Sequence, residues 1–221
     1  MKAVAIDGPA GAGKSTIARK LAAELGYIYV DTGALYRAIG YCVLSRGIDV
    51  KDEVAVQGLL AGLDIQLRFV DMEQRVFIGE VDVTSKIRTE AVSMAASAVS
   101  ALPPVRAFLL DLQRDIAANN NVVMDGRDIA TVILPHADVK IFLTASAEER
   151  ARRRYEELIK KGASADYEAV LADLQKRDYD DSHREIAPLK PAAGAVLVDT
   201  TGNELETSIE LLTNIVKEHL G

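Results

Sequence analysis

The sequence predicts an α/β fold, a three-layer sandwich in which helices cover both faces of a central parallel sheet. Short apolar runs that stop at aspartate and glycine alternate with amphipathic helices, as in parallel strands joined by helical crossovers. The length of 221 residues suits one large domain or a domain with an inserted piece. With 49% hydrophobic and 27% charged residues, the chain has the composition of a globular protein with a sizeable core.

The first elements follow this alternation closely. Strands are predicted at residues 1–6 and 27–30, because each is a short apolar run that leads into an aspartate and a glycine. Apolar residues recur every four positions between residues 14 and 25, which predicts an amphipathic helix that ends at Gly26. A second helix is predicted at about residues 34–45.

The middle of the chain interrupts the rhythm. Two β-rich runs at residues 63–70 and 75–83 predict an antiparallel hairpin, with residues 71–74 between them. Helices are predicted at residues 89–101 and 105–118.

We therefore expect residues 60–100 to form a small inserted subdomain of mixed α/β structure. Residues 1–59 and 101–221 then form the core. After the insert, strands are predicted at 122–124, 139–143 and 195–198, and helices at 147–161, 167–177 and from 204 onward.

Residues 8–15 read Gly-Pro-Ala-Gly-Ala-Gly-Lys-Ser, which is the P-loop pattern between a predicted strand and a predicted helix. Glycines let backbone N–H groups turn toward a polyphosphate, and the following helix directs its positive end at the same anion. Lys14 can follow charge between the β- and γ-phosphates, and the Ser15 hydroxyl is a hard oxygen ligand suited to Mg²⁺. The nucleoside triphosphate site is predicted to comprise Gly8, Pro9, Ala10, Gly11, Ala12, Gly13, Lys14, Ser15 and Thr16.

A P-loop leaves several functions open. A GTPase switch should carry an Asn-Lys-x-Asp guanine reader, which the sequence lacks, and a transport or motor ATPase would need more chain. A small kinase needs only this core, a second substrate pocket and a mobile cover. A nucleotide-gated interaction module and an RNA-associated protein remain as alternatives.

Charge and composition disfavour several partners. The net charge of −7, from 26 basic and 33 acidic side chains, argues against a nucleic-acid or anionic-membrane binder. The single Cys42 cannot form an intrachain disulfide, which fits a reducing compartment. The three histidines lack metal-ligand spacing, and no run of residues looks like a membrane span or a signal peptide. We expect a cytoplasmic enzyme, and a monomer because no long apolar stripe is left over.

Three further segments are more specific than the P-loop. Residues 31–37 read Asp-Thr-Gly-Ala-Leu-Tyr-Arg, and residues 125–128 read Asp-Gly-Arg-Asp. Residues 177–184 read Arg-Asp-Tyr-Asp-Asp-Ser-His-Arg and are followed by Ala-Pro-Leu at 187–189. With the P-loop, these segments make the chain resemble the bacterial cytidylate kinases almost end to end, within the P-loop nucleoside monophosphate kinases.

The resemblance implies transfer of the ATP γ-phosphoryl group to CMP or dCMP, giving CDP or dCDP and ADP, in pyrimidine nucleotide metabolism. Residues 60–100 would then be the NMP-binding subdomain, and about 149–188 a helical lid. The implied acceptor-phosphate ligands are Arg37 and Arg127, since a guanidinium fork matches phosphate oxygens. The implied ribose ligands are Thr32, Arg177 and Asp181, and the implied cytosine ligands are Ser97, Arg106, Asp128 and Arg184.

Each of these residues also has an ordinary structural role open to it. Asp31 and Asp125 could simply end strands or cap turns, and Arg37 could form a surface salt bridge worth ~0.5 kcal/mol. The arginines at 150 and 152–154 could be a solvated helix face or an RNA patch. We expect Lys14, Arg150 and Arg154 to act in catalysis. Other kinases of the adenylate, shikimate or dephospho-coenzyme A type would share the P-loop and differ in the acceptor pocket.

Overall fold

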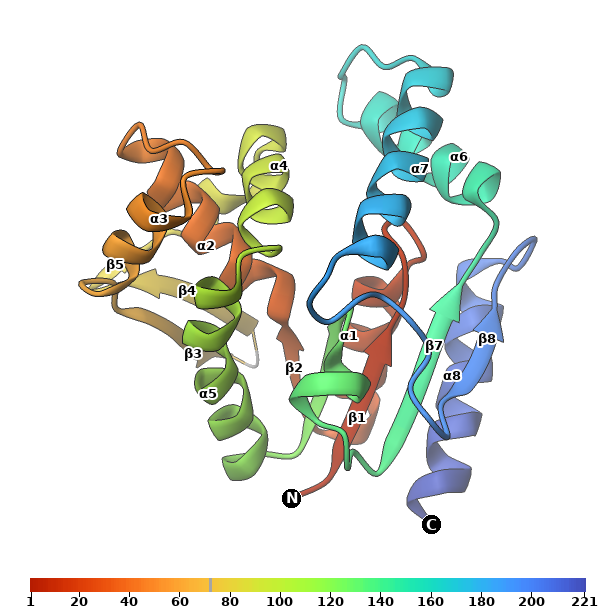
Figure 1. The fold of residues 1–221 in the computed structure, drawn as a ribbon. Helices are drawn as coiled ribbons and strands as arrows, with labels where there is room; N and C mark the ends of the chain where they lie inside the picture. The colour runs from red at the N-terminus through yellow and green to blue at the C-terminus, as the bar shows by residue number, and fades with distance from the viewer. Residues whose placement is uncertain (72) are drawn as a thin grey trace. The chain divides into compact units, whose positions relative to one another are not determined.

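The computed structural model describes residues 1–71 and 73–221. By its contacts the chain divides into two compact units (Figure 1). The first comprises Ile28–Asn120 with Met1, and the second comprises Lys2–Tyr27 and Asn121–Gly221. Each unit is described in turn. The predicted boundaries of the insert, residues 60–100, are narrower than the first unit and remain a prediction about a functional subdomain.

The second unit contains the predicted parallel sheet. Four strands pair in parallel in the order β6-β1-β7-β8, with Asp7 opposite Gly126 on one side and Phe142 on the other. Val4, Ala5 and Ile6 of β1 are fully buried, which explains why this strand is apolar without alternation. The strands are β1 (Ala3–Asp7), β6 (Val122–Gly126), β7 (Val139–Thr144) and β8 (Val196–Asp199).

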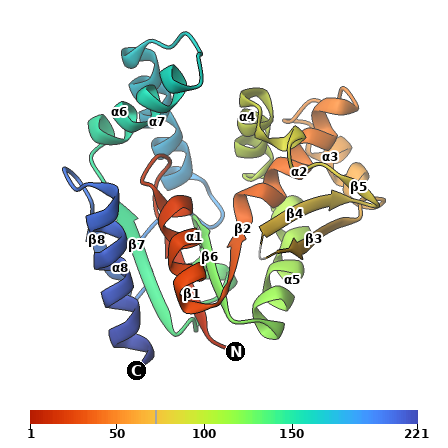
Figure 2. The same ribbon diagram turned by 180° about the vertical axis from the view of Figure 1, so that it is seen from behind.

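Helices α1 (Lys14–Leu25) and α8 (Leu205–Leu220) pack together on one face of this sheet (Figure 2). Their apolar stripes are buried, and Glu24 of α1 accepts hydrogen bonds from Lys217 and Thr213 of α8. Gly26 ends α1 in the left-handed conformation at φ 67°, so this predicted helix end is confirmed.

Two more helices of this unit, α6 (Ala147–Lys160) and α7 (Tyr167–His183), pack against each other. Helix α7 continues six residues beyond the predicted end at Arg177. The acidic run after that residue offered no apolar stripe, but the Lys176–Asp180 ion pair at 2.6 Å supports one further turn. A short helix, η2 (Ile129–Ile133), follows β6 and was not predicted.

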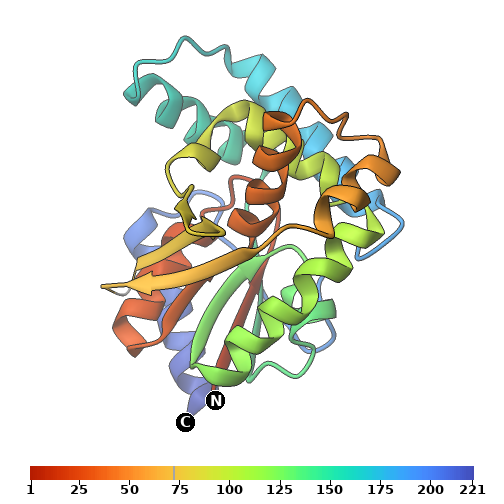
Figure 3. The same ribbon diagram turned by 90° about the vertical axis from the view of Figure 1, so that its left-hand side faces the viewer.

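The first unit has a helical core with a hairpin beside it. Helices α2 (Thr32–Ser45) and α4 (Glu90–Val99) pack closely. Leu35, Ile39, Val99 and Leu109 are fully buried in the core of this unit. Figure 3 shows the face of this unit on which the hairpin and α5 lie, and residues from both line the same core. Its elements are β2 (Ile28–Asp31), α2 (Thr32–Ser45), α3 (Glu53–Leu60), β3 (Ile65–Val70), β4 (Glu73–Ile78), β5 (Val81–Asp82), η1 (Lys86–Arg88), α4 (Glu90–Val99) and α5 (Pro103–Asn119).

The predicted hairpin is confirmed, with Leu67 opposite Val76, but its second strand is shorter than predicted. The run 75–83 is two strands, because Gly79 at φ 56° turns the chain and β5 pairs back on β4. The predicted turn at 71–74 includes Met72, which lies outside the described residues. Helix α3 was not predicted, although Asp52 caps it by accepting the Ala55 N–H.

No single helix among residues 1–71 and 73–221 is long and apolar enough to cross a membrane. Helices α4 and α5 meet the length and composition only as a pair, and the pair is bent by 99°. Buried side chains from both helices, such as Val99 and Leu109, belong to the core of the first unit.

Candidate functional site

The P-loop connects β1 to α1 in the second unit, as predicted. A Cβ at Gly8 would lie 1.9 Å from the Leu143 carbonyl oxygen of β7, so only glycine fits there. Gly13, at φ 82°, precedes α1, and no side chain caps the helix. The first N–H groups of α1 therefore lack a side-chain acceptor, which is the arrangement that receives phosphate oxygens.

Lys14 is buried although it carries an ammonium group. Its Nζ donates to the Pro9 carbonyl at 2.8 Å, so the side chain folds back over the loop. The pKa of Lys14 is lowered to about 7, first by burial and then by the positive charge of Arg127. The carboxylates that oppose this shift are those of Asp125, Asp7 and Asp181. A site that depresses the pKa of its lysine in this way favours a strongly anionic ligand.

Binding of a nucleoside triphosphate should therefore be coupled to protonation of Lys14. At about pH 8 the amine is mostly neutral in the nucleotide-free protein, and phosphate charge should raise its pKa back toward 10.5. We expect uptake of ~1 proton on binding, measured by calorimetry in buffers of different ionisation enthalpy. Lys14→Met should abolish the uptake, and a binding heat independent of the buffer in the unchanged protein would contradict this assignment.

Ser15 faces a carboxylate at the end of the neighbouring strand. Its Oγ donates to Asp125 Oδ2 at 2.9 Å, and Asp125 is 4% exposed at the carboxyl end of β6. A hydroxyl and a carboxylate are the hard oxygen ligands that Mg²⁺ takes beside nucleotide phosphates, so these two residues fit that ion. No cluster of three His, Cys, Asp or Glu side chains that could hold a metal occurs in the part of the chain that the structure describes.

Four of the predicted substrate ligands form one chain of alternating charges in the second unit. Arg127 Nε donates to Asp181 Oδ2 at 2.7 Å, so the loop after β6 is joined to α7. Arg184 Nη1 lies 3.9 Å from Asp181 Oδ1, and Arg184 Nη2 lies 3.8 Å from Asp128 Oδ1. The Arg184 and Asp128 side chains are only 8% and 5% exposed, so their charges interact with little screening by solvent.

Four more predicted substrate ligands, Thr32, Arg37, Ser97 and Arg106, lie in the first unit, at the start of α2 and on α4 and α5. Asp31 caps α2 by accepting the Ala34 N–H, which confirms the capping role left open for it. The same carboxylate accepts from Arg37 Nη2 at 2.6 Å, so Arg37 forms an ion pair, but a partly buried one and not the solvated surface salt bridge considered above. Arg106 donates to the Ser100 carbonyl and lies 5.7 Å from the Tyr36 ring centroid. Thr32 is buried, and Ser97 is half-buried on α4.

Gln74 of the hairpin binds the backbone of Asp31, the residue whose side chain pairs with Arg37. Its Oε1 accepts the Asp31 N–H at 2.8 Å, and its Nε2 donates to the Asp31 carbonyl at 3.1 Å. Gln74→Ala removes both bonds, so we expect the free energy of unfolding to fall by ~1–2 kcal/mol in denaturant titrations. The matched variant Gln66→Ala loses only bonds to the Asp64 and Arg68 side chains and should cost less than ~0.5 kcal/mol. Equal losses would show that the bonds to Asp31 add nothing.

Comparison with known proteins identifies the family. The cytidylate kinase family model matches residues 4–218. The cytidylate kinase of Carboxydothermus hydrogenoformans is 52% identical over 213 residues, covering 96% of each chain. That of Leuconostoc mesenteroides is 48% identical over 217 residues, covering 98% of this chain and 97% of the other. The chain belongs to the cytidylate kinase family.

It is therefore an enzyme that phosphorylates CMP or dCMP with ATP, as the resemblance implied. Among solved structures, an uncharacterized protein from Eubacterium ventriosum superposes with a TM-score of 0.54 over 98% of this chain. At 12% identity this likeness concerns the fold alone. The α/β class with a parallel sheet is confirmed by the strand pairing itself.

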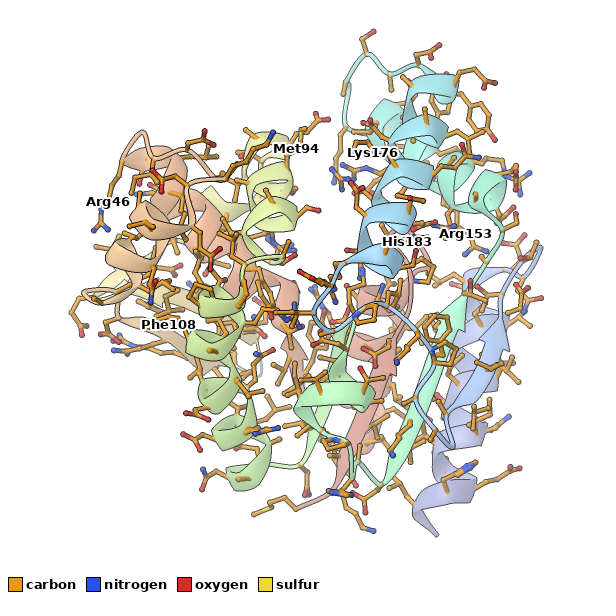
Figure 4. The ribbon with its side chains drawn as sticks, in the orientation of Figure 1. Arg46, Met94, Phe108, Arg153, Lys176 and His183 are labelled. Atoms are coloured by element: carbon orange, nitrogen blue, oxygen red, sulfur yellow. The ribbon has the colours of Figure 1, made fainter. Side chains whose placement is uncertain are left out.

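The arginines of α6 lie in different environments. Arg150 is buried and donates to the Ala145 and Ala10 carbonyls and to Asp178 Oδ2, so it joins α6 to the P-loop and to α7. Arg153, labelled in Figure 4 with Lys176 and His183 of α7, donates to the Thr200 carbonyl. The exposed Arg152 and Arg154 pair with Glu149 and Glu157, as expected of a solvated helix face. Arg177 is half-buried on α7.

Sequence reasoning missed three polar contacts around the site. The interpretation of Asp125 as a strand end overlooked its bond to Ser15, and Gln74 and Asp7 were not singled out at all. For Asp125 the sequence did contain a signal. An aspartate that ends a strand next to the P-loop strand lies at the same edge of the sheet as the P-loop, and so within reach of it. Gln74 offered none, because its partner is a backbone group 43 positions away.

Proposed function

We propose that the chain binds ATP with Mg²⁺ on residues 8–16 and CMP or dCMP on the arginine and aspartate ligands that the sequence predicts. The observation that carries the proposal is electrostatic. Burial, and after it the positive charge of Arg127, the proposed ligand of the acceptor phosphate, lower the pKa of the P-loop Lys14. Lys14 and Arg127 carry like charges that repel each other, so binding of a polyanionic ligand by each of them is favoured. Phosphoryl transfer between two nucleotides requires their phosphates to lie side by side in this way.

The acceptor would be held by three groups of side chains. Arg37 and Arg127 would bind the CMP phosphate through their guanidinium groups. In the structure these two arginines donate hydrogen bonds to Asp31 and Asp181, respectively. The proposed ribose ligands are Thr32, Arg177 and Asp181, and the proposed base ligands are Ser97, Arg106, Asp128 and Arg184.

Asp128 gives the proposal its base preference. A carboxylate accepts from the exocyclic amine of cytosine, whereas uracil would present a carbonyl and place two acceptors face to face. Arg184 forms an ion pair with this carboxylate, with 3.8 Å between Arg184 Nη2 and Asp128 Oδ1.

The reaction demands alignment and charge neutralisation more than covalent chemistry. An oxygen of the CMP phosphate forms a bond to the γ-phosphorus while the bond from that phosphorus to the bridging oxygen of ADP breaks. Lys14 would follow the charge that moves onto the β-phosphate, and no general base is required. Mg²⁺ on Ser15 and Asp125 would supply further neutralisation of the phosphate oxygens.

Water must be kept from the γ-phosphate. We propose that the lid, residues 149–188, closes over ATP, with Arg150 and Arg154 as its candidate catalytic cations and residues 60–100 as the subdomain that receives the acceptor. Arg150 supports this role, because it already joins α6, α7 and the Ala10 carbonyl of the P-loop.

The setting proposed for the enzyme is a cytoplasmic monomer without nucleic-acid or membrane partners. The net charge of −7 and the single Cys42, which is buried and free, support it.

An ADP-release assay against a panel of nucleoside monophosphates tests the proposal directly. We expect CMP and dCMP to give the highest kcat/KM, UMP a lower value and AMP and GMP little turnover. A preference for AMP or for a non-nucleotide acceptor would overturn the acceptor assignment. Turnover of ATP that no acceptor stimulates would favour a nucleotide-gated interaction module instead.

A further inference from the structure

Asp7 is a buried carboxylate to which the proposed reaction gives no role. It is the last residue of β1, directly before Gly8 of the P-loop, and it is 1% exposed. Its Oδ1 accepts the Ile129 N–H and its Oδ2 accepts the Ala130 N–H, both at 2.8 Å. The side chain thus joins the strand that leads into the P-loop to the segment that follows Asp128.

The two N–H groups open the helix η2 (Ile129–Ile133). Groups at a helix start have no acceptor within the helix, and the residue just before it, here Asp128, ordinarily supplies one from its side chain. Asp128 does not: it is the N-cap residue of η2, and its side chain makes no capping hydrogen bond. Asp7, more than 120 positions away, accepts from the helix start in its place.

Because Asp7 caps η2, the Asp128 side chain does not have to. A carboxylate that caps its own helix would be turned back toward the Ile129–Ile133 backbone. Because Asp7 satisfies those N–H groups, the Asp128 carboxylate can lie toward Arg184, 3.8 Å away. Burial raises the pKa of Asp7 to about 6, so the charged form is kept there at a free-energy cost that an uncharged residue would not have.

We propose that Asp7 is a positioning residue for base recognition: by capping η2 from the adjacent strand, it keeps the Asp128 carboxylate directed at the cytosine amine. The inference rests on the proposed function, in which Asp128 reads the base. It predicts that a change at Asp7, a residue of the ATP-binding strand, alters the choice between CMP and UMP.

The decisive variant is Asp7→Asn, which preserves size and shape. The amide keeps one acceptor oxygen but presents an NH₂ donor to the second backbone N–H, so Asp128 is drawn back to cap the helix. We expect the ratio of kcat/KM for CMP to that for UMP to fall ~10-fold, mainly through the KM for CMP, with the KM for ATP changed less than ~2-fold.

Asp138→Asn is the matched control. Asp138 also accepts a backbone N–H of β1, that of Ala3 at 2.8 Å, but at the opposite end of the strand. It should lower stability without changing the CMP to UMP ratio. Equal losses for CMP, UMP and ATP in Asp7→Asn would mean that Asp7 is only structural, and the inference would fail.

A double variant separates this inference from the proposed function. If Asp7 acts through Asp128, then Asp7→Asn should not change the CMP to UMP ratio further in an Asp128→Ala background. An additional change there would overturn the inference. If Asp128→Ala by itself leaves the ratio unchanged, the proposed base reading fails. If Asp128→Ala lowers the ratio and Asp7→Asn does not, only the role of Asp7 fails.

The unsubstituted enzyme provides a test that does not depend on the folding of a variant. Amide hydrogen exchange at Ile129 and Ala130 reports the two bonds to Asp7. We expect saturating CMP to slow exchange at these amides several-fold more than saturating UMP. Equal protection by both nucleotides would overturn the inference.

Discussion

Replacing Lys14 with alanine should lower kcat at least ~100-fold, the scale measured for loss of one preorganised charge contact at a reacting oxygen. Lys14 is buried, and its Nζ donates only to the Pro9 carbonyl among the hydrogen bonds described for it, so it can turn toward phosphate. Without the ammonium, no positive charge of the P-loop would balance the charge that develops on the β-phosphate near the Asp125 carboxylate.

The loss should not arise from unfolding. Burial opposes the charged form of Lys14, so removing the ammonium relieves a cost and should leave the melting temperature near that of the unchanged enzyme. Lys20→Ala, an exposed lysine on the same helix α1, is the matched control and should retain full turnover. Single-turnover and steady-state rates check both variants, and near-normal turnover of Lys14→Ala would remove the P-loop lysine from the mechanism.

Asp128→Ala should reduce kcat/KM for CMP by ~2–3 kcal/mol, which is ~30- to 150-fold, and that for UMP by less. The side chain is 5% exposed, so its bond to the base amine would form with little competition from water. UMP offers no amine at that position and therefore has less to lose.

Asp128→Asn sharpens the test of base choice. Its amide can still accept through oxygen but can also donate to a uracil carbonyl, so the preference should shift toward UMP while the volume is unchanged. Initial rates with CMP and UMP at fixed ATP measure both variants. If CMP and UMP suffered equally, Asp128 would support the fold around Arg184 and would not read the base.

Local patterns predicted most of the fold because each one depends on a few consecutive residues. The glycines and Lys14 of the P-loop, the helix end at Gly26 and the buried strand before Asp7 all follow from spacing or from backbone conformation. The errors are local as well. Gly79 divided a run predicted as one strand, and α7 continued through an acidic segment without an apolar stripe.

By itself the sequence determined the α/β class, the P-loop and, through three motifs, the resemblance to the cytidylate kinases from which the acceptor residues are proposed. Only the tertiary structure decided how those residues are held. The bond from Ser15 to Asp125 spans 110 positions, and that from Arg127 to Asp181 spans 54. The cap that Asp7 places on η2 likewise joins segments that are distant in the chain. The reason is physical. Periodicity in the sequence reports which side of one helix or strand is buried. A polar partner on another strand depends on the register of the sheet and on which backbone N–H and carbonyl groups still need a hydrogen-bond partner.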